Sequence, residues 1–288
     1  MSTKISPQIL KSPLRYPGGK SKALSFLIPY LPPIDSLDSY VEPMVGGGSM
    51  FLYFLSRYPH LKFWINDLNY DVFIFWKSLK DNPDYLINEV KSHLNFKNSV
   101  LEKHEKDYYL ELKNQVVERL DYAKRAALWF VLNRISFSGT THSGGFSKDA
   151  FYSRFNHKSV YRLIQVSEIF KKCDLTITCN DVTQIEPLSN KSFYFLDPPY
   201  CSAKKSKLYG VKGDLHSNFS HFTLSKFVHP LTNPVMMTYD NSIDIKKLYP
   251  SPPFRLIEWN LGYSMTNVGK THSKQGNELL ILNYQPQT

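Results

Sequence analysis

An acidic residue, two prolines and a tyrosine stand in a row at Asp197, Pro198, Pro199 and Tyr200. The two prolines prevent the apolar segment over 192–196 from continuing as strand or helix, so these groups are held at a strand's end. A carboxylate and a prolyl carbonyl can accept both hydrogens of an exocyclic amine, while the ring covers the face of a heteroaromatic base. The tetrapeptide therefore predicts chemistry on an aromatic amine, with an ordinary Asp-Pro turn as the alternative.

A short strand over 39–43 brings a second carboxylate, Glu42, to a run of glycines. Pro43 follows it, the glycines extend from Gly46 to Gly48, and an apolar helix is predicted over 49–57. Glycines between a first strand and a first helix let a ligand approach the backbone closely, with the amino end of the helix facing it. This arrangement predicts a binding loop, and a flexible turn is the alternative.

A second predicted strand, over 61–66, ends at Asp67. It follows the glycines at roughly the 20-residue separation at which an acidic side chain meets ribose hydroxyls in a nucleotide-binding unit. The dinucleotide fingerprint itself is incomplete, because Phe51 stands where the third glycine would fall. The two strand-end acids and the glycine loop together favour a ligand of the adenosine type.

A third cluster lies near the amino terminus, where Gly19 and Lys20 imitate the end of a phosphate-binding loop. Leu14 occupies the position of that loop's first glycine, and no apolar strand precedes it, so the sequence excludes a P-loop ATPase. What remains is a compact loop that presents the ring of Tyr16 and the ammonium of Lys20. Such a loop suits a ligand with a carboxylate and a flat base, or it is a plain surface turn.

Taken in order, these segments resemble the Dam-like DNA adenine methyltransferase family, which consists of S-adenosylmethionine-dependent amino-methyltransferases with a DPPY motif. The resemblance rests on the amino-terminal motif 17–20, the cofactor loop 42–48, the ribose segment 65–69, the tetrapeptide 197–200 and a closing strand at 277–281. Each motif is modest, but the ordered set covers almost the whole chain.

The resemblance implies a set of site residues. The catalytic residues are Asp197, Pro198, Pro199 and Tyr200. The residues that border S-adenosylmethionine are Tyr16, Gly19, Lys20, Glu42, Pro43, Gly46, Gly48, Asp67, Asp181 and Asp197. Asp181 is placed by analogy with the acidic residue that meets the cofactor's adenine, and a plain turn at 181–182 is its alternative. No metal site is predicted.

The implied reaction is transfer of a methyl group to the 6-amino group of adenine in duplex DNA. The base must leave the duplex to reach the pocket, and Tyr200 would replace its lost stacking. Three alternatives remain: a methyltransferase acting on the exocyclic amine of cytosine, an RNA methyltransferase, and a non-catalytic DNA-binding relic. The relic is disfavoured because every expected position is filled.

The implied fold is α/β, a Rossmann-like class I methyltransferase sheet with an inserted, mainly helical target-recognition domain. Residues 1–70 and 173–288 would form the catalytic domain. Residues 71–172 would form the insertion, with a hairpin near 136–155. Later strands are predicted at 174–179, 192–196, 234–239, 254–258 and 278–284. A hydrophobic content of 42% in 288 residues is enough for a sizeable core.

Composition agrees with double-stranded DNA as the partner. The chain has 35 Lys and Arg against 25 Asp and Glu, a formal charge of +10 and a pI of about 9.3. The predicted DNA contacts are Arg134, Ser138, His142, Lys148, Arg154, Lys204 and Lys205. The three unpaired cysteines and the lack of a membrane span or secretion signal indicate a cytoplasmic protein, and no obligatory protein partner is evident.

The predicted target-recognition segment departs from the best-known pattern of this family. In members that recognise GATC, the corresponding segment resembles the pattern Asn-Arg-x-x-x-Asn-Gly-x-x-Arg. Here Ser138 replaces the second asparagine and His142 the second arginine. Arginine contacts guanine through two hydrogen bonds, which histidine cannot reproduce. The resemblance therefore carries over the chemistry and leaves the target sequence open, with GATC disfavoured.

Overall fold

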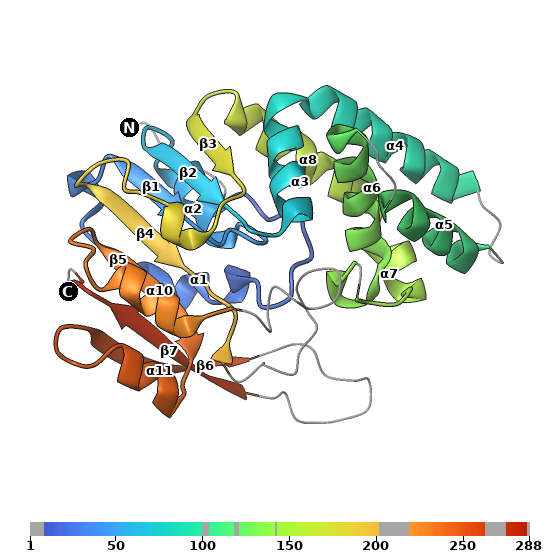
Figure 1. Cartoon of the computed structure of the whole chain (residues 1–288). Helices are drawn as coiled ribbons and strands as arrows, with labels where there is room; N and C mark the ends of the chain where they lie inside the picture. Colours follow the sequence, from blue (N-terminus) through green and yellow to red (C-terminus); the bar gives the residue numbers. More distant parts are fainter. Residues whose placement is uncertain are drawn as a thin grey trace, which may run out of the picture.

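A mixed seven-stranded sheet forms the centre of the computed structural model, which describes residues 9–99, 104–117, 121–141, 143–201, 219–262 and 275–286. The strand order is β3-β2-β1-β4-β5-β7-β6 (Figure 1). The first five strands in this order pair in parallel, and β7 runs antiparallel to both of its neighbours. The predicted α/β class is confirmed. The strands are β1 (Ser39–Glu42), β2 (Lys62–Asn66), β3 (Asp174–Thr178), β4 (Ser192–Leu196), β5 (Val235–Asp240), β6 (Arg255–Gly262) and β7 (Gln275–Leu282).

Alternating side chains of the sheet face two different hydrophobic layers, as β4 illustrates. Phe193 and Phe195 pack on the side of α2 (Ser49–Arg57), whereas Tyr194 and Leu196 pack on the side of α10 (His221–Val228) and α11 (Ile243–Leu248). Successive side chains of a strand point to opposite faces, so a strand covered on both faces is apolar throughout. This is why an unbroken apolar run precedes Asp197.

Six helices lie between β2 and β3 in the described part of the chain, and Figure 1 shows them gathered beside the sheet. Among them α6 is apolar around almost its whole circumference, with residues 126–135 buried, and it contacts α3, α4, α5 and α7. A helix buried on all sides forms the centre of a bundle. The helices are α3 (Tyr70–Asp81), α4 (Pro83–Ser99), α5 (Glu105–Val117), α6 (Tyr122–Ile135), α7 (Lys148–Ser153) and α8 (His157–Phe170).

Short helical turns complete the described elements. They are α1 (Leu24–Leu27) and the 3₁₀ turns η1 (Lys20–Lys22), η2 (Ile28–Tyr30), η3 (Ile34–Ser36), η4 (Phe137–Gly139) and η5 (Val182–Gln184). None of the helices within the described ranges is long and apolar enough to cross a membrane.

The segment 136–155 was predicted as a hairpin or loop. Among its described residues an isolated antiparallel bridge joins Ser136 and Phe146, and α7 follows, with its first turn capped by the Ser147 side chain accepting from the Ala150 N–H at 3.2 Å. The last two strands are offset from their predicted ranges. They pair over eight residues each and extend into polar positions such as Asn260 and Asn277, which an apolar pattern does not reveal.

Candidate active site

The chain order of the strands reverses next to β1, which lies between β2 on one side and β4 on the other. Ligands of open α/β sheets bind at the carboxyl ends of the strands at such a switch point. A cavity of about 340 Å³ lies at this edge, a size suited to a small organic ligand. All residues predicted to be catalytic or cofactor-binding line it: Tyr16, Gly19, Lys20, Glu42, Pro43, Gly46, Gly48, Asp67, Asp181, Asp197, Pro198, Pro199 and Tyr200.

The glycine loop forms one wall of the cavity, and the ring of Tyr16 lies directly against it. Gly46 has a φ of +45°, and a Cβ there would stand 2.6 Å from the Tyr16 ring. A Cβ on Gly47 would stand 2.8 Å from the Tyr16 Cβ. The Trp76 indole N–H donates to the Gly46 carbonyl at 3.0 Å and holds the loop from behind. The glycines are therefore required for the contact between loop and ring.

Asp67 is buried at the end of β2 and fixes the loop through its two carboxylate oxygens. One accepts the Gly46 N–H and the other the Asn69 N–H, both at 2.8 Å. Burial raises the pKa of Asp67 to about 6, while these two hydrogen bonds oppose the rise. An ionised carboxylate has about four accepting positions, so Asp67 keeps capacity for hydroxyl donors of a ligand.

Asn66, which the sequence did not single out, joins two walls of the cavity. Its Nδ2 donates to the carbonyls of Pro43 and Asn180 at 2.9 Å, and its Oδ1 accepts the Asn180 N–H at 2.8 Å. The loop after β3 is thereby tied to the loop after β1. Asp181 follows in that loop, exposed, and its carboxylate accepts from the N–H and the hydroxyl of Thr183. The sequence signal for Asn66 was a polar residue at the end of a buried strand.

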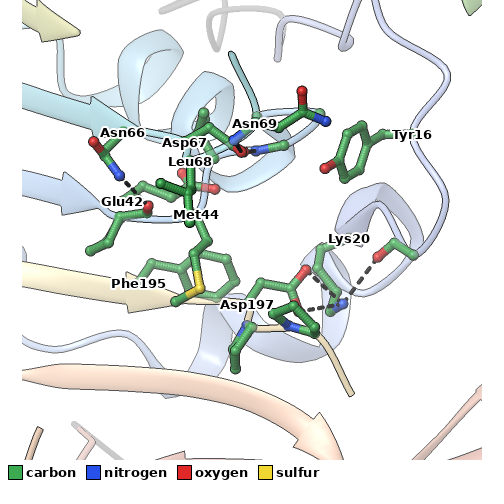
Figure 2. Close-up of a pocket in the computed structure, with 18 of the residues that line it drawn as sticks. Tyr16, Lys20, Glu42, Met44, Asn66, Asp67, Leu68, Asn69, Phe195 and Asp197 are labelled. Carbon is green, nitrogen blue, oxygen red and sulfur yellow. Dashed lines mark hydrogen bonds and ion pairs between the residues drawn. The ribbon is translucent and has the colours of Figure 1, made fainter. Parts of the chain in front are cut away.

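The side chains of Asp197 and Lys20 meet at the wall of the cavity, as Figure 2 shows. The Lys20 Nζ lies 2.6 and 2.8 Å from the two carboxylate oxygens and also donates to the Gly18 carbonyl. The buried Thr238 hydroxyl on β5 donates to Asp197 Oδ1 at 2.7 Å. Two donated hydrogen bonds and an ion pair thus fix the carboxylate, and Oδ2 retains room for a further donor. Thr238 is a second residue that the sequence did not indicate, since nothing near it in the chain marks it as part of the site.

Glu278 and Lys20 together orient the side chain of Tyr200. Its hydroxyl donates to the carboxylate of Glu278, which is buried on β7, and Lys20 Nζ lies 5.0 Å from the centroid of its ring. The next residue, Cys201, donates its N–H to Asp240 at 2.8 Å. The antiparallel strand β7 therefore supports the tetrapeptide. The sequence signal for Glu278 was a carboxylate directly before the apolar run 279–282.

Glu42 adds a third carboxyl group to the cavity. It is almost fully buried and accepts the Tyr40 hydroxyl at 2.5 Å. Burial raises the pKa of Glu42 well above its ordinary value, and the charges of Asp197 and Asp67 raise it further. A positively charged group of a ligand beside Glu42 would offset these effects and favour the ionised form of the carboxyl group. Within the described residues, no three His, Cys, Asp or Glu side chains are grouped to hold a metal ion.

The residues predicted to contact DNA are placed less uniformly. Lys148 and Arg154 are exposed, and Ser138 lies in η4 with a φ of 52°. Arg134 is buried, and its guanidinium donates to the Arg154 carbonyl at 2.6 and 3.0 Å and to the Pro13 carbonyl at 3.2 Å. This position does not fit the prediction of a DNA contact, because the guanidinium holds backbone segments together. The predicted contacts His142, Lys204 and Lys205 lie outside the described residues.

This sheet order, with a ligand cavity at the switch point and the tetrapeptide on its rim, is that of a class I methyltransferase. A family model described as D12 class N6 adenine-specific DNA methyltransferase matches residues 16–265. The chain belongs to this family. Its activity is accordingly adenine-specific DNA methylation, for which the family implies S-adenosylmethionine as the methyl donor.

Individual relatives agree with this assignment. Type II methyltransferase M.MjaIII of Methanocaldococcus jannaschii is 28% identical, over 94% of this chain and 98% of its own. Type II methyltransferase M1.LlaDCHI of Lactococcus lactis subsp. cremoris is 25% identical over 94% of both chains. A DNA adenine methylase of Vibrio cholerae is 28% identical over 65% of this chain and 64% of its own.

Proposed function

We propose that the cavity binds S-adenosylmethionine and that Asp197, Pro198 and Tyr200 position the 6-amino group of an extruded adenine for methylation. The observation that carries this proposal is the convergence of the glycine loop, Asp67 and Asp197 on one cavity at the sheet's switch point.

The residues present fit S-adenosylmethionine. Asp67 keeps accepting positions for ribose hydroxyls, and the glycine loop allows close approach of the ligand to the backbone. A sulfonium or ammonium group of the ligand would offset the repulsion that Asp197 and Asp67 exert on the carboxyl group of Glu42. When bound, the cofactor supplies an electrophilic methyl group. Asp181, at the rim, is proposed to meet the adenine end.

Positioning of the target amine falls to the tetrapeptide. An aromatic amine is a weak nucleophile because its lone pair is delocalised into the ring. Hydrogen bonds from the amine to Asp197 and the Pro198 carbonyl would pull the nitrogen toward tetrahedral geometry and direct the lone pair at the methyl carbon. Such an in-line displacement depends on orientation and electrostatics and requires no enzyme nucleophile. Thr238 and Lys20 hold Asp197 in place for this task.

The proposed substrate is duplex DNA with the target base flipped out. Tyr200 would stack on that base, and Glu278 fixes the orientation of its ring. The helical segment 71–172 is proposed to act as the target-recognition insertion. The loop after α6 carries the exposed Phe137. Lys148, at the start of α7, and Arg154, just after its end, are also exposed, and their charges would meet phosphates. Because Ser138 and His142 replace the residues of the GATC pattern, we propose a different short target.

The test is methyl transfer from tritiated S-adenosylmethionine by the purified full-length protein, followed by digestion of the product to nucleosides. The expected result is label in N6-methyladenine from duplex DNA. Label in N4-methylcytosine would show the alternative amine chemistry, and label on RNA alone would show an RNA enzyme. Cofactor binding without any transfer would indicate a non-catalytic relic. Each of these three outcomes would overturn the proposal.

A further inference from the structure

Several side chains join the amino-terminal loop of the cavity to the helical insertion, and the one that binds both backbones is buried. Asn133, in the last turn of α6, is fully buried. Its Oδ1 accepts the Arg15 N–H at 2.8 Å, and its Nδ2 donates to the carbonyls of Arg15 at 2.8 Å and Gly139 at 2.9 Å. One amide therefore holds the backbone before Tyr16 and the backbone of η4 in a fixed relation.

The contact between these two loops is so close that it requires a glycine. Gly139 has a φ of +76°, and a Cβ there would stand 2.0 Å from the Arg15 carbonyl oxygen. The Arg15 guanidinium adds two bonds across the same seam, to the carbonyls of Arg134 at 3.1 Å and Ser136 at 2.7 Å. We call Asn133, Gly139 and Arg15 the clasp.

Contacts continue from the clasp to the cavity without a gap. Arg15 is followed by Tyr16, whose ring lies against Gly46 and Gly47, and Gly46 is in turn held by Asp67. In the other direction, η4 begins at the exposed Phe137 in the loop assigned to target recognition. Asn133 itself is not among the residues that line the cavity.

We propose that the clasp couples DNA binding to cofactor binding, with Asn133 as the positioning residue. A shift of η4 on DNA moves the Arg15 backbone and, through Tyr16, the wall against which the cofactor lies. Coupling between two binding equilibria is reciprocal, so cofactor must change DNA affinity by the same factor. The proposal rests on the proposed function of the two regions, and contact alone does not establish coupling, so the coupling has to be measured.

The experiment is calorimetric titration of the full-length protein with S-adenosylhomocysteine, with and without saturating duplex DNA from a methylation-free host. In the natural protein DNA is expected to tighten binding about fivefold or more, within the usual range of coupling. Asn133→Ala and Gly139→Ala should bring the ratio of the two affinities for S-adenosylhomocysteine, with DNA and without it, toward one. Asn133→Asp matches the asparagine in size, keeps the bond from the Arg15 N–H and loses both donated bonds, so it should do the same. Thermal unfolding reports which variants remain folded.

Gly145→Ala is the matched control, because a Cβ at that glycine of the same loop meets no described atom within 4 Å, and its ratio should equal that of the natural protein. Folded clasp variants with an unchanged ratio would overturn the proposal, and so would a ratio of one in the natural protein. In both cases the protein would still bind S-adenosylhomocysteine, so the proposed function would not be refuted. A natural protein that binds no S-adenosylhomocysteine would refute the proposed function itself. If Asn133→Ala does not fold, the affinity ratios of Asn133→Asp and Gly139→Ala test the proposed coupling.

Discussion

The edge of the sheet and the helical insertion differ in how closely the structure follows the sequence motifs. At the sheet edge, five separate segments meet around one cavity, and each predicted residue lines it. In the insertion, the residues predicted to meet DNA are divided: Lys148 and Arg154 are exposed, whereas Arg134 is buried and holds the Pro13 and Arg154 carbonyls. A sequence motif at the end of a strand fixes where its side chains lie, because parallel strands end at one edge of the sheet. A motif on a helix does not fix which way a side chain points.

The largest expected effect concerns the sheet edge. Asp197→Ala should lower kcat by roughly 100- to 1000-fold or more, the range seen when one preorganised polar group is removed from a reacting centre. Cofactor affinity should change much less. Single-turnover transfer of tritiated methyl groups to DNA measures the first quantity and calorimetry the second. The exposed Asp244 on α11 supplies the control, since Asp244→Ala should leave both unchanged. Near-normal transfer by Asp197→Ala would remove the tetrapeptide from the chemistry.

The division within the insertion can be tested with two arginines. Arg134→Ala should destabilise the fold by about 1–3 kcal/mol for each buried carbonyl left without a donor. Arg154→Ala should leave the melting temperature within error and reduce the salt dependence of DNA binding by about one phosphate contact. Thermal unfolding and DNA titrations at several salt concentrations measure the two effects. If Arg134→Ala were as stable as the natural protein and lost DNA affinity, the original prediction of a DNA contact would be right.

Asp67 offers a pH test of the cavity. Asp67→Ala should weaken S-adenosylmethionine binding by roughly 1–3 kcal/mol through loss of the hydroxyl acceptor. In the natural protein only the ionised carboxylate accepts two hydroxyls, and its pKa is raised to about 6 by burial. Affinity should therefore be full above that pH and fall as the pH drops through it. Titrations from neutral to mildly acid pH should show this step in the natural protein and lack it in Asp67→Ala. The same step in the variant would assign it to another group.

The smallest expected effect concerns Tyr200. The ring face is proposed to stack on the base, so Tyr200→Ala should cost roughly 1–3 kcal/mol in transfer. Tyr200→Phe keeps the face and loses one hydrogen bond to Glu278, and it should retain much of the activity. Comparison of kcat/KM for the two variants measures the difference. Equal loss in both would show that the hydroxyl, held by Glu278, matters more than the ring face.

Much of the fold and cavity could be predicted because local rules fix them. Prolines end β4, glycines open the loop after β1, and parallel strands bring their carboxyl ends to one edge. Glu278 and Thr238 escaped prediction because they reach the site from strands far away in the sequence, through pairing that no local pattern encodes. The burial of Arg134 was hidden for a related reason: residues 126–135 of α6 are all buried, so a charged residue among them does not mark a face that meets solvent.

The most direct test of the account is single-molecule sequencing of DNA from a methylation-free host that expresses the protein, because it reports the modified base and its context together. If the sheet edge fixes the chemistry and the insertion fixes the target, the DNA should contain N6-methyladenine in a short sequence context that is not restricted to GATC. DNA from a host that expresses Asp197→Ala should carry no modification. Modified cytosine, or N6-methyladenine confined to GATC, would contradict it.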